Sequence, residues 1–183
     1  MIQYRYLRRE DLEVMRGIDR SDYSHRWCSV RNGHIVQEER VFHHRGFSSS
    51  DWDRIITEFS NALDRNRMVI AGALEDGKLL GIAGLDTAVK YGIKKDMYNL
   101  GPMWVSREHR GRGIGKELFG MMVQKALEHD IEALYVSSTP SPATVDFYIG
   151  LGCKLLKEPD PILFEEEPED IHLRYELDRQ RFK

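Results

Sequence analysis

The residues with the clearest chemical potential lie near the middle of the chain, where positions 110 to 115 read Arg-Gly-Arg-Gly-Ile-Gly. A short apolar run, Leu100 to Val105, precedes them, and apolar residues at helical spacing follow from Ile114. Glycines between a strand and the first turn of a helix let backbone N–H groups face a ligand, and the helix N-terminus adds about half a positive charge. This arrangement predicts a binding site for phosphate or pyrophosphate oxygens.

Two common phosphate-binding loops do not fit these residues. A P-loop requires glycine where Arg110 stands and Ser or Thr where Glu117 stands. A dinucleotide fingerprint requires its last glycine where Lys116 stands. The pattern R/Q-x-x-G-x-G/A does fit, through Arg110, Gly113 and Gly115, and it resembles the acyl-CoA pyrophosphate loop of the GNAT superfamily of N-acyltransferases. The alternative is an ordinary glycine-rich turn before a helix.

A second segment carries the same resemblance. Residues 141 to 153 are similar to the superfamily's N-x-x-A-x-x-F-Y-x-x-x-G-F motif, which ends here in a Phe-Tyr pair and a Gly turn. Three positions depart from it, with Ser141 for asparagine, Thr144 for alanine and Cys153 for phenylalanine. The two motifs cover residues 99 to 155, and before residue 99 the resemblance rests on the order of elements alone.

The hydrophobic periodicity predicts strands and helices in the order β-α-(hairpin)-α-β-β-β-α-β-α-β-β. Helices are expected over residues 9–18, 48–63, 113–129 and 142–150, and strands over 2–7, 68–74, 79–86, 99–105, 133–138 and 171–177, with one more strand after the turn at Leu151-Gly152-Cys153. The resemblance implies an α/β (α+β) GNAT fold, with a mixed, mostly antiparallel sheet of about six or seven strands, about four flanking helices and splayed fourth and fifth strands. We expect one domain over residues 1–183, with a hairpin insertion at about 23–47 that turns at Asn32-Gly33.

The resemblance also implies acetyl-CoA as the cosubstrate. Its phosphates would meet the N–H groups from Gly111 to Lys116, with the side chains of Arg110 and Arg112 nearby, and its pantetheine arm would pair with the backbones of Met103 and Val105. The N–H near Met103 would also stabilise the oxyanion of the reaction. The complete set of expected acetyl-CoA contacts is Met103, Trp104, Val105, Arg110, Gly111, Arg112, Gly113, Ile114, Gly115, Lys116, Ser141 and Thr144.

Gly101-Pro102 lies inside the expected strand over residues 99–105. Because proline cannot donate to a β-ladder, it predicts a bulge or a strand that is unpaired on that side. A strand that starts only at Met103 is the alternative.

Tyr148 matches the position from which many GNAT enzymes present a phenol to the thioester sulfur. A CoA thiolate should have a pKa of about 8.5, against about 10 for tyrosine, so a hydrogen bond that strengthens during the reaction describes this role better than full proton transfer. The alternative role of Tyr148 is packing in the core. Many relatives carry a glutamate as general base at positions matching Asn99 or Gly101, and neither of these residues can accept a proton. The identity of the general base is therefore open. Asn99 could orient a water, and Asp86, Asp96, Glu38 or Glu39 could reach a water chain.

These residues favour an N-acetyltransferase that moves an acetyl group from acetyl-CoA to a primary amine of a small molecule, by direct attack in a ternary complex. The alternatives are a CoA-binding sensor or interaction module with little turnover, and an acetyltransferase for protein N-termini or lysines. Glu158 to Asp170 is rich in carboxylates and has three prolines, so we expect an extended, stiff connection that attracts a polycationic acceptor. A merely solvated acidic loop explains the same residues.

The composition narrows the partners. A net charge of −3 gives no reason to expect nucleic acid or an anionic membrane, and no apolar run approaches the roughly 18 residues of a transmembrane helix. The start of the sequence has no signal-peptide core, and the only cysteines, Cys28 and Cys153, favour a reducing cytoplasm. His43 and His44 would point to opposite faces of a strand, so no metal site is expected. A homodimer is left open.

Overall fold

The computed structural model describes residues 1–179, and the chain falls into two compact units. We describe each unit by itself. Unit 1 comprises Met1–Asp22, His44–Ala88 and Leu100–Lys125, and unit 2 comprises Tyr23–His43, Val89–Asn99 and the chain from Ala126 onward.

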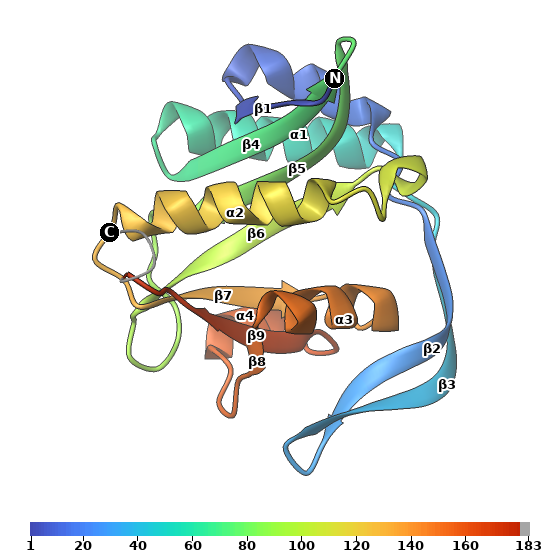
Figure 1. Ribbon diagram of the computed structural model, residues 1–183, viewed down its shortest axis with the longest axis vertical. Helices are drawn as coiled ribbons and strands as arrows, with labels where there is room; N and C mark the ends of the chain where they lie inside the picture. Colours follow the sequence, from blue (N-terminus) through green and yellow to red (C-terminus); the bar gives the residue numbers. More distant parts are fainter. Residues whose placement is uncertain (180–183) are drawn as a thin grey trace. The chain divides into compact units, whose positions relative to one another are not determined.

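One sheet holds seven strands in the order β1-β4-β5-β6-β7-β9-β8 (Figure 1). Their bounds are β1 Gln3–Tyr6, β4 Met68–Glu75, β5 Lys78–Asp86, β6 Met97–Val105, β7 Ala133–Ser138, β8 Lys154–Leu155 and β9 Ile171–Glu176. The pairs β1–β4, β4–β5, β5–β6, β7–β9 and β8–β9 are antiparallel. A mixed, mostly antiparallel sheet confirms the predicted fold class.

The helices of the described chain are α1 Ser49–Asp64, α2 Ile114–Leu127, α3 Pro142–Leu151 and α4 Pro161–Glu166, with 3-10 helices η1 Arg9–Gly17 and η2 Arg107–His109. Helix α1 begins at a capping box, in which Ser48 accepts from the N–H of Asp51 and the Asp51 side chain accepts from the N–H of Ser48. The expected first helix over residues 9–18 has 3-10 rather than α geometry.

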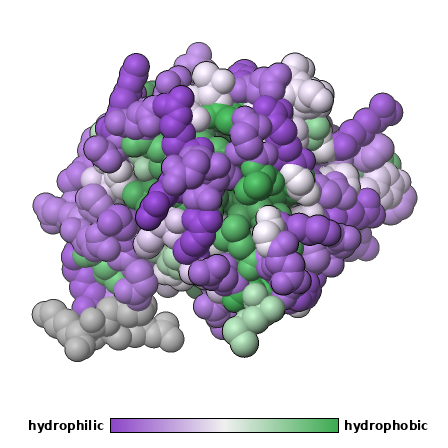
Figure 2. Space-filling model, turned by 90° about the horizontal axis from the view of Figure 1, so that it is seen from above, coloured by the Kyte–Doolittle hydropathy of each residue, from purple (hydrophilic) through white to green (hydrophobic). Residues whose placement is uncertain are grey.

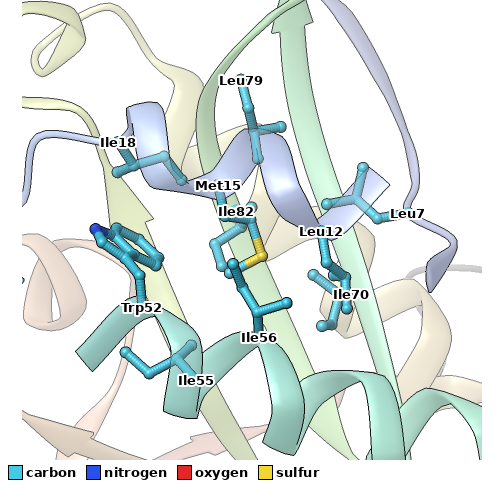
Figure 3. Packing of buried hydrophobic residues seen from close by; sticks show 10 residues of the cluster. All are labelled: Leu7, Leu12, Met15, Ile18, Trp52, Ile55, Ile56, Ile70, Leu79 and Ile82. Carbon is cyan, nitrogen blue, oxygen red and sulfur yellow. The ribbon is translucent and has the colours of Figure 1, made fainter. Parts of the chain in front are cut away.

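The core of unit 1 lies between η1, α1 and the strands β4 and β5 (Figure 3). Leu12 and Met15 from η1 meet Ile56 from α1 and Ile70 and Ile82 from the two strands. Four of these five side chains are fully buried, and burying each contributes about 1.5–3 kcal/mol. This packing holds β5 firmly, and β5 in turn sets the position of β6.

Two tight hairpin turns contain Asn-Gly and Asp-Gly pairs, which tolerate positive φ. Asn32-Gly33 joins β2 (Asp22–Arg31) to β3 (His34–His44), which form a separate two-stranded sheet. Asp76-Gly77 joins β4 to β5. Both pairs have positive φ, at 52° and 76° in the first turn and 50° and 77° in the second, as a type I′ hairpin requires.

Strand β6 contains the bulge that Pro102 predicts. Leu85 pairs with Leu100 and Ala83 pairs with Met103, so Gly101 and Pro102 share one position opposite Gly84. A Cβ on Gly84 would lie 2.9 Å from Cγ of Pro102, and only glycine leaves room for the proline ring. The alternative of a strand starting at Met103 is wrong, because β6 begins at Met97.

The expected extended connection over Glu158 to Asp170 is also wrong, because α4 occupies its middle. Asp160 caps this helix by accepting from the N–H of Ile162, and Pro161 stands at the first helical position. Proline is favoured there because its fixed φ suits the helix and its missing N–H is not needed. The prolines thus start and stop a short helix.

Within residues 1–179, no helix combines the length and apolar character needed to cross a membrane. Figure 2 shows hydrophilic residues over most of the face in view, with smaller hydrophobic areas between them.

Candidate functional site

The glycine loop before α2 has the open backbone that phosphate binding requires. Gly111 and Gly113 have φ of 75° and 81°, and a Cβ on either would meet nothing within 4 Å. The bond from the N–H of Glu117 to the carbonyl of Gly113, at 3.2 Å, opens the hydrogen-bond ladder of the helix. The N–H groups of Ile114, Gly115 and Lys116 precede that bond and have no acceptor within the helix.

Arg110 uses its guanidinium within the protein. Nε donates to the carbonyl of Val105 at 3.1 Å, Nη1 to Oδ1 of Asp22 at 3.2 Å and Nη2 to the carbonyl of Ser21 at 3.2 Å. The side chain therefore fastens the loop to the end of β6. Arg112 and Lys116 are also exposed, with Nη1 of Arg112 2.9 Å from Nδ1 of His109 and Nη2 3.8 Å from Oε2 of Glu75.

The backbone N–H and C=O groups of successive residues in β6 point alternately toward β5 and away from it. The N–H of Ser106 donates to the carbonyl of Leu80 at 2.8 Å, so the backbone groups of Ser106 and Trp104 face β5. The backbone groups of Met103 and Val105 consequently point away from β5, which is the direction that pairing with a pantetheine arm requires. The Trp104 side chain instead stacks on Phe59, with ring centroids 6.0 Å apart, and packs against the unit 1 core.

In unit 2, α3 carries the second motif. Ser141 caps the helix by accepting from the N–H of Thr144, and the two hydroxyl oxygens lie 2.8 Å apart. Tyr148 is only 5% exposed and meets Phe147 edge to face, with centroids 5.2 Å apart. The helix ends at Gly152, with φ of 103°. The motif positions of Ser141 and Gly152 thus have structural roles, and acetyl-CoA contacts of Ser141 and Thr144 stay a prediction.

Asn99 is the expected catalytic residue on β6, and its Oδ1 is buried with no hydrogen-bond partner among the described residues. The carboxylates left open as bases have other surroundings. Asp96 lies 3.0 Å from Nη1 of Arg174, Asp86 accepts from the N–H of Ala88 at 2.8 Å, Glu38 pairs with Arg31, and Glu39 is exposed on β3.

Unit 2 contains a buried hydrogen-bond network that neither sequence motif indicates. The Tyr135 hydroxyl lies 2.8 Å from Nδ1 of His172 and accepts from the N–H of Asp160 at 3.2 Å, while Nε2 of His172 is 3.2 Å from the carbonyl of Glu167. Burial raises the pKa of Tyr135 and lowers that of His172, so both are neutral near pH 7. The Asp160-Pro161 pair, a helix-start signal, could have located one end of this network.

Asp160 joins the network to the loop before β6. Its carboxylate is fully buried and accepts from the N–H of Gly92 at 2.9 Å and from Nζ of Lys95 at 3.1 Å. Burial acts to raise its pKa, but these bonds and that from Ile162 outweigh burial and lower it. Asp160 therefore stays charged and fixes the segment that leads into Met97 and Asn99.

Two contacts fasten the hairpin β2–β3 to the rest of unit 2. The N–H of Cys28 donates to the carbonyl of Pro140 at 2.7 Å, directly after β7. Arg40 lies 4.0 Å above the ring of Trp27 and pairs with Glu169 at 2.9 Å, directly before β9. The hairpin consequently lies at the edge of unit 2 where β7 ends and β9 begins.

The two cysteines are buried thiols. Burial raises the pKa of the Cys28 thiol, and it raises that of Cys153 to about 12, so neither is a thiolate at neutral pH. In the described part of the chain, no three His, Cys, Asp or Glu side chains come together as a metal site.

Solved structures of acetyltransferases share the architecture of this chain. Nourseothricin acetyltransferase matches 97% of this chain and 99% of its own with a TM-score of 0.71 and 17% identity. PaiA N-acetyltransferase from Thermoplasma acidophilum, solved with coenzyme A, matches 96% and 99% with a TM-score of 0.63 and 18% identity. The ribosomal-protein-S18-alanine N-acetyltransferase from Escherichia coli matches 97% and 95% with a TM-score of 0.60 and 14% identity.

At these identities the structural likeness shows the fold alone, and the two names that state an acceptor, nourseothricin and a ribosomal-protein alanine, differ in it. Curated protein sequences give no significant match. The model of the acetyltransferase (GNAT) family matches residues 14–152, which includes the glycine loop and the α3 motif. The chain therefore belongs to the GNAT acetyltransferase family and is an acetyl-CoA-dependent acyltransferase.

Proposed function

We propose that this enzyme transfers the acetyl group of acetyl-CoA to a primary amine of a small molecule, by direct attack in a ternary complex. Acetyl-CoA supplies the activated acetyl thioester when it is bound. The family match spans parts of both units, and we propose that residues 1–183 work as one acetyltransferase domain.

The glycine loop fits the phosphates of acetyl-CoA. The positive φ of Gly111 and Gly113 and the open space beside both leave the backbone accessible, and the first N–H groups of α2 favour an anion. We assign the phosphate contacts to the N–H groups from Gly111 to Lys116, with Arg112 and Lys116 as the nearby cations. Arg110 acts by holding the loop, because its guanidinium already has three protein acceptors.

We propose that the backbones of Met103 and Val105 pair with the pantetheine arm, because both point away from β5. Tyr148 would donate a hydrogen bond to the sulfur that leaves. Its burial supports this role, since a hydrogen bond between partly charged groups is stronger where water is excluded. Asn99 would contact the acceptor or a water beside it.

The observation that carries the choice of a small acceptor is the position of the hairpin β2–β3. Its bonds to Pro140 and Glu169 hold it at the edge of unit 2 formed by the end of β7 and the start of β9. A hairpin held there limits the size of what can approach this edge. We infer that a free amine fits better than a folded protein.

Carboxylates near this edge support a cationic acceptor. Glu165, Glu166 and Glu167 are exposed at the end of α4. Such a surface raises the encounter rate of cations. A polycationic amine is the acceptor that we favour. We place the enzyme in the cytoplasm, because its reducing conditions suit the two free, buried cysteines.

The proposal is tested by thiol release from acetyl-CoA with two sets of acceptors. One set contains small primary amines of different charge, and the other contains lysine-bearing and N-terminally free peptides. We expect release that depends on a small amine. Release with peptides only, or none with either set, would contradict the proposal.

A further inference from the structure

A pocket of about 270 Å³ opens in unit 1 where α1 ends, β4 begins and β5 ends. Met68, the first residue of β4, pairs with Asp86, the last residue of β5, so both strands reach the pocket. The N–H of Thr87 donates to the carbonyl of Arg67 at 2.9 Å and fastens the end of β5 to the turn between α1 and β4. The lining of the pocket shares no residue with the glycine loop, β6 or α3.

The turn between α1 and β4 has a fixed backbone. Asn66 has φ of 52°, and its N–H donates to the carbonyl of Leu63 at 3.0 Å. The N–H of Arg67 donates to the carbonyl of Ala62 at 2.9 Å. These are the two bonds of a Schellman motif, which satisfies the last carbonyls of a helix. Arg65 and Arg67 therefore stand on a rigid turn, one on either side of Asn66.

The two arginines bring unmatched positive charge to the pocket. Arg65 and Arg67 line it and are exposed, and neither side chain has a hydrogen bond or an ion pair among residues 1–179. The two carboxylates of the lining already have donors. Glu58 accepts from Nη1 of Arg54 at 3.1 Å, and Asp86 accepts from the backbone N–H two residues further on at 2.8 Å. The pocket consequently offers its free donors to an anion.

The rest of the lining is suited to a molecule with carbon atoms. Ala62 and Met68 are half-buried apolar side chains, and Met68 packs against the core of unit 1. Asn61 is exposed at the rim and supplies an amide that can donate or accept. Since water occupies about 30 Å³ per molecule in the liquid, the pocket has room for about nine non-hydrogen atoms.

We propose that this pocket binds a small organic anion, with a carboxylate or phosphate group at Arg65 and Arg67 and its carbon atoms against Ala62 and Met68. A guanidinium presents its N–H donors in a planar fork that matches either group. The apolar side chains favour an organic anion over an inorganic one, because only the former covers them. The inference goes beyond acetyl transfer and does not depend on the acceptor amine.

The binding test uses calorimetry at constant ionic strength with succinate, glycerol phosphate and the neutral analogue succinamide. We expect at least one of the two anions to bind and succinamide not to bind. The anion that binds identifies the group that the arginines recognise. The measurement needs neither turnover nor acetyl-CoA, so its result is independent of the proposed function.

Arg65→Gln and Arg67→Gln should each raise the Kd of that anion about tenfold, because a hydrogen bond to a charged group is lost. The Tm should stay unchanged in both variants, since neither side chain has a partner in the folded protein. Arg45→Gln is the matched control. Arg45 is exposed, has no side-chain partner among the described residues and lies outside the pocket lining, so its replacement should leave the Kd unchanged.

Several results would overturn the inference: no binding of either anion, binding of succinamide as tight as that of succinate, or an unchanged Kd in Arg65→Gln and Arg67→Gln. An equal loss in Arg45→Gln would do the same, because it would show a response to net charge alone. Crystals soaked in the anion that binds should show it between Arg65 and Arg67, in contact with Met68. Density for the anion only elsewhere on the protein would contradict the assignment of this pocket.

Discussion

Replacing Gly113 with alanine tests the phosphate-binding loop most sharply. At φ of 81° an alanine costs about 1–2 kcal/mol of backbone strain, but the added Cβ would meet nothing within 4 Å in the protein. The added methyl group would instead occupy space beside the N–H groups that we assign to the phosphates. Losing one or two hydrogen bonds to a charged ligand, at about 1.5–3 kcal/mol each, should weaken CoA binding at least tenfold.

Gly77→Ala is the matched control. Gly77 has φ of 77°, equally open surroundings and a place in the β4–β5 turn. Urea unfolding should show similar losses of stability in both variants, because the strain is the same. Calorimetry with CoA should show weaker binding in Gly113→Ala only. Parent-like affinity in Gly113→Ala, or an equal loss in Gly77→Ala, would refute the assignment of the loop.

Three further predictions concern catalysis, charge and pH. Tyr148→Phe keeps the packing of α3 and should lower turnover about 100-fold while CoA affinity is retained. Turnover within a few-fold of the parent would assign Tyr148 a packing role in the core. If the acceptor is polycationic, its kcat/KM should fall steeply with added salt, and fall again when Glu165 and Glu166 become glutamine. Kinetics that do not respond to salt would exclude an electrostatic attraction between these carboxylates and the acceptor. Burial, and then the nearby charges of Glu167 and Glu169, raise the pKa of Asp170 from 3.8 to about 7. The folded protein then holds a proton that the unfolded chain releases, so this carboxyl's contribution to stability is complete below about pH 4 and is lost as the pH rises through 7. Asp170→Asn should flatten that decline, by at least about 1 kcal/mol between pH 5 and 8 in urea unfolding, and an unchanged slope would contradict the raised pKa.

Local signals predicted much of the fold. The strand over residues 133–138 has its predicted bounds, and the bulge at Pro102 follows from a single residue with one dominant preference. The sequence does not predict α4, because three prolines favour an extended chain, although Asp-Pro also starts helices.

The candidate site likewise has a part that the sequence predicts and a part that it does not. The glycine loop was predictable because its backbone conformation needs glycine at particular positions. The network of Tyr135, His172 and Asp160 was not, since its members are far apart in the sequence and meet only through strand pairing and the start of α4.

The central claim is that the acetyl group moves to the nitrogen of a small amine. Its most direct test is an untargeted metabolite screen with isotope-labelled acetyl-CoA, comparing the parent enzyme with Gly113→Ala. We predict a labelled N-acetyl amide of a small, cationic molecule that forms with the parent and is strongly reduced with the variant. Label found only in proteins, or in no product at all, would contradict the account.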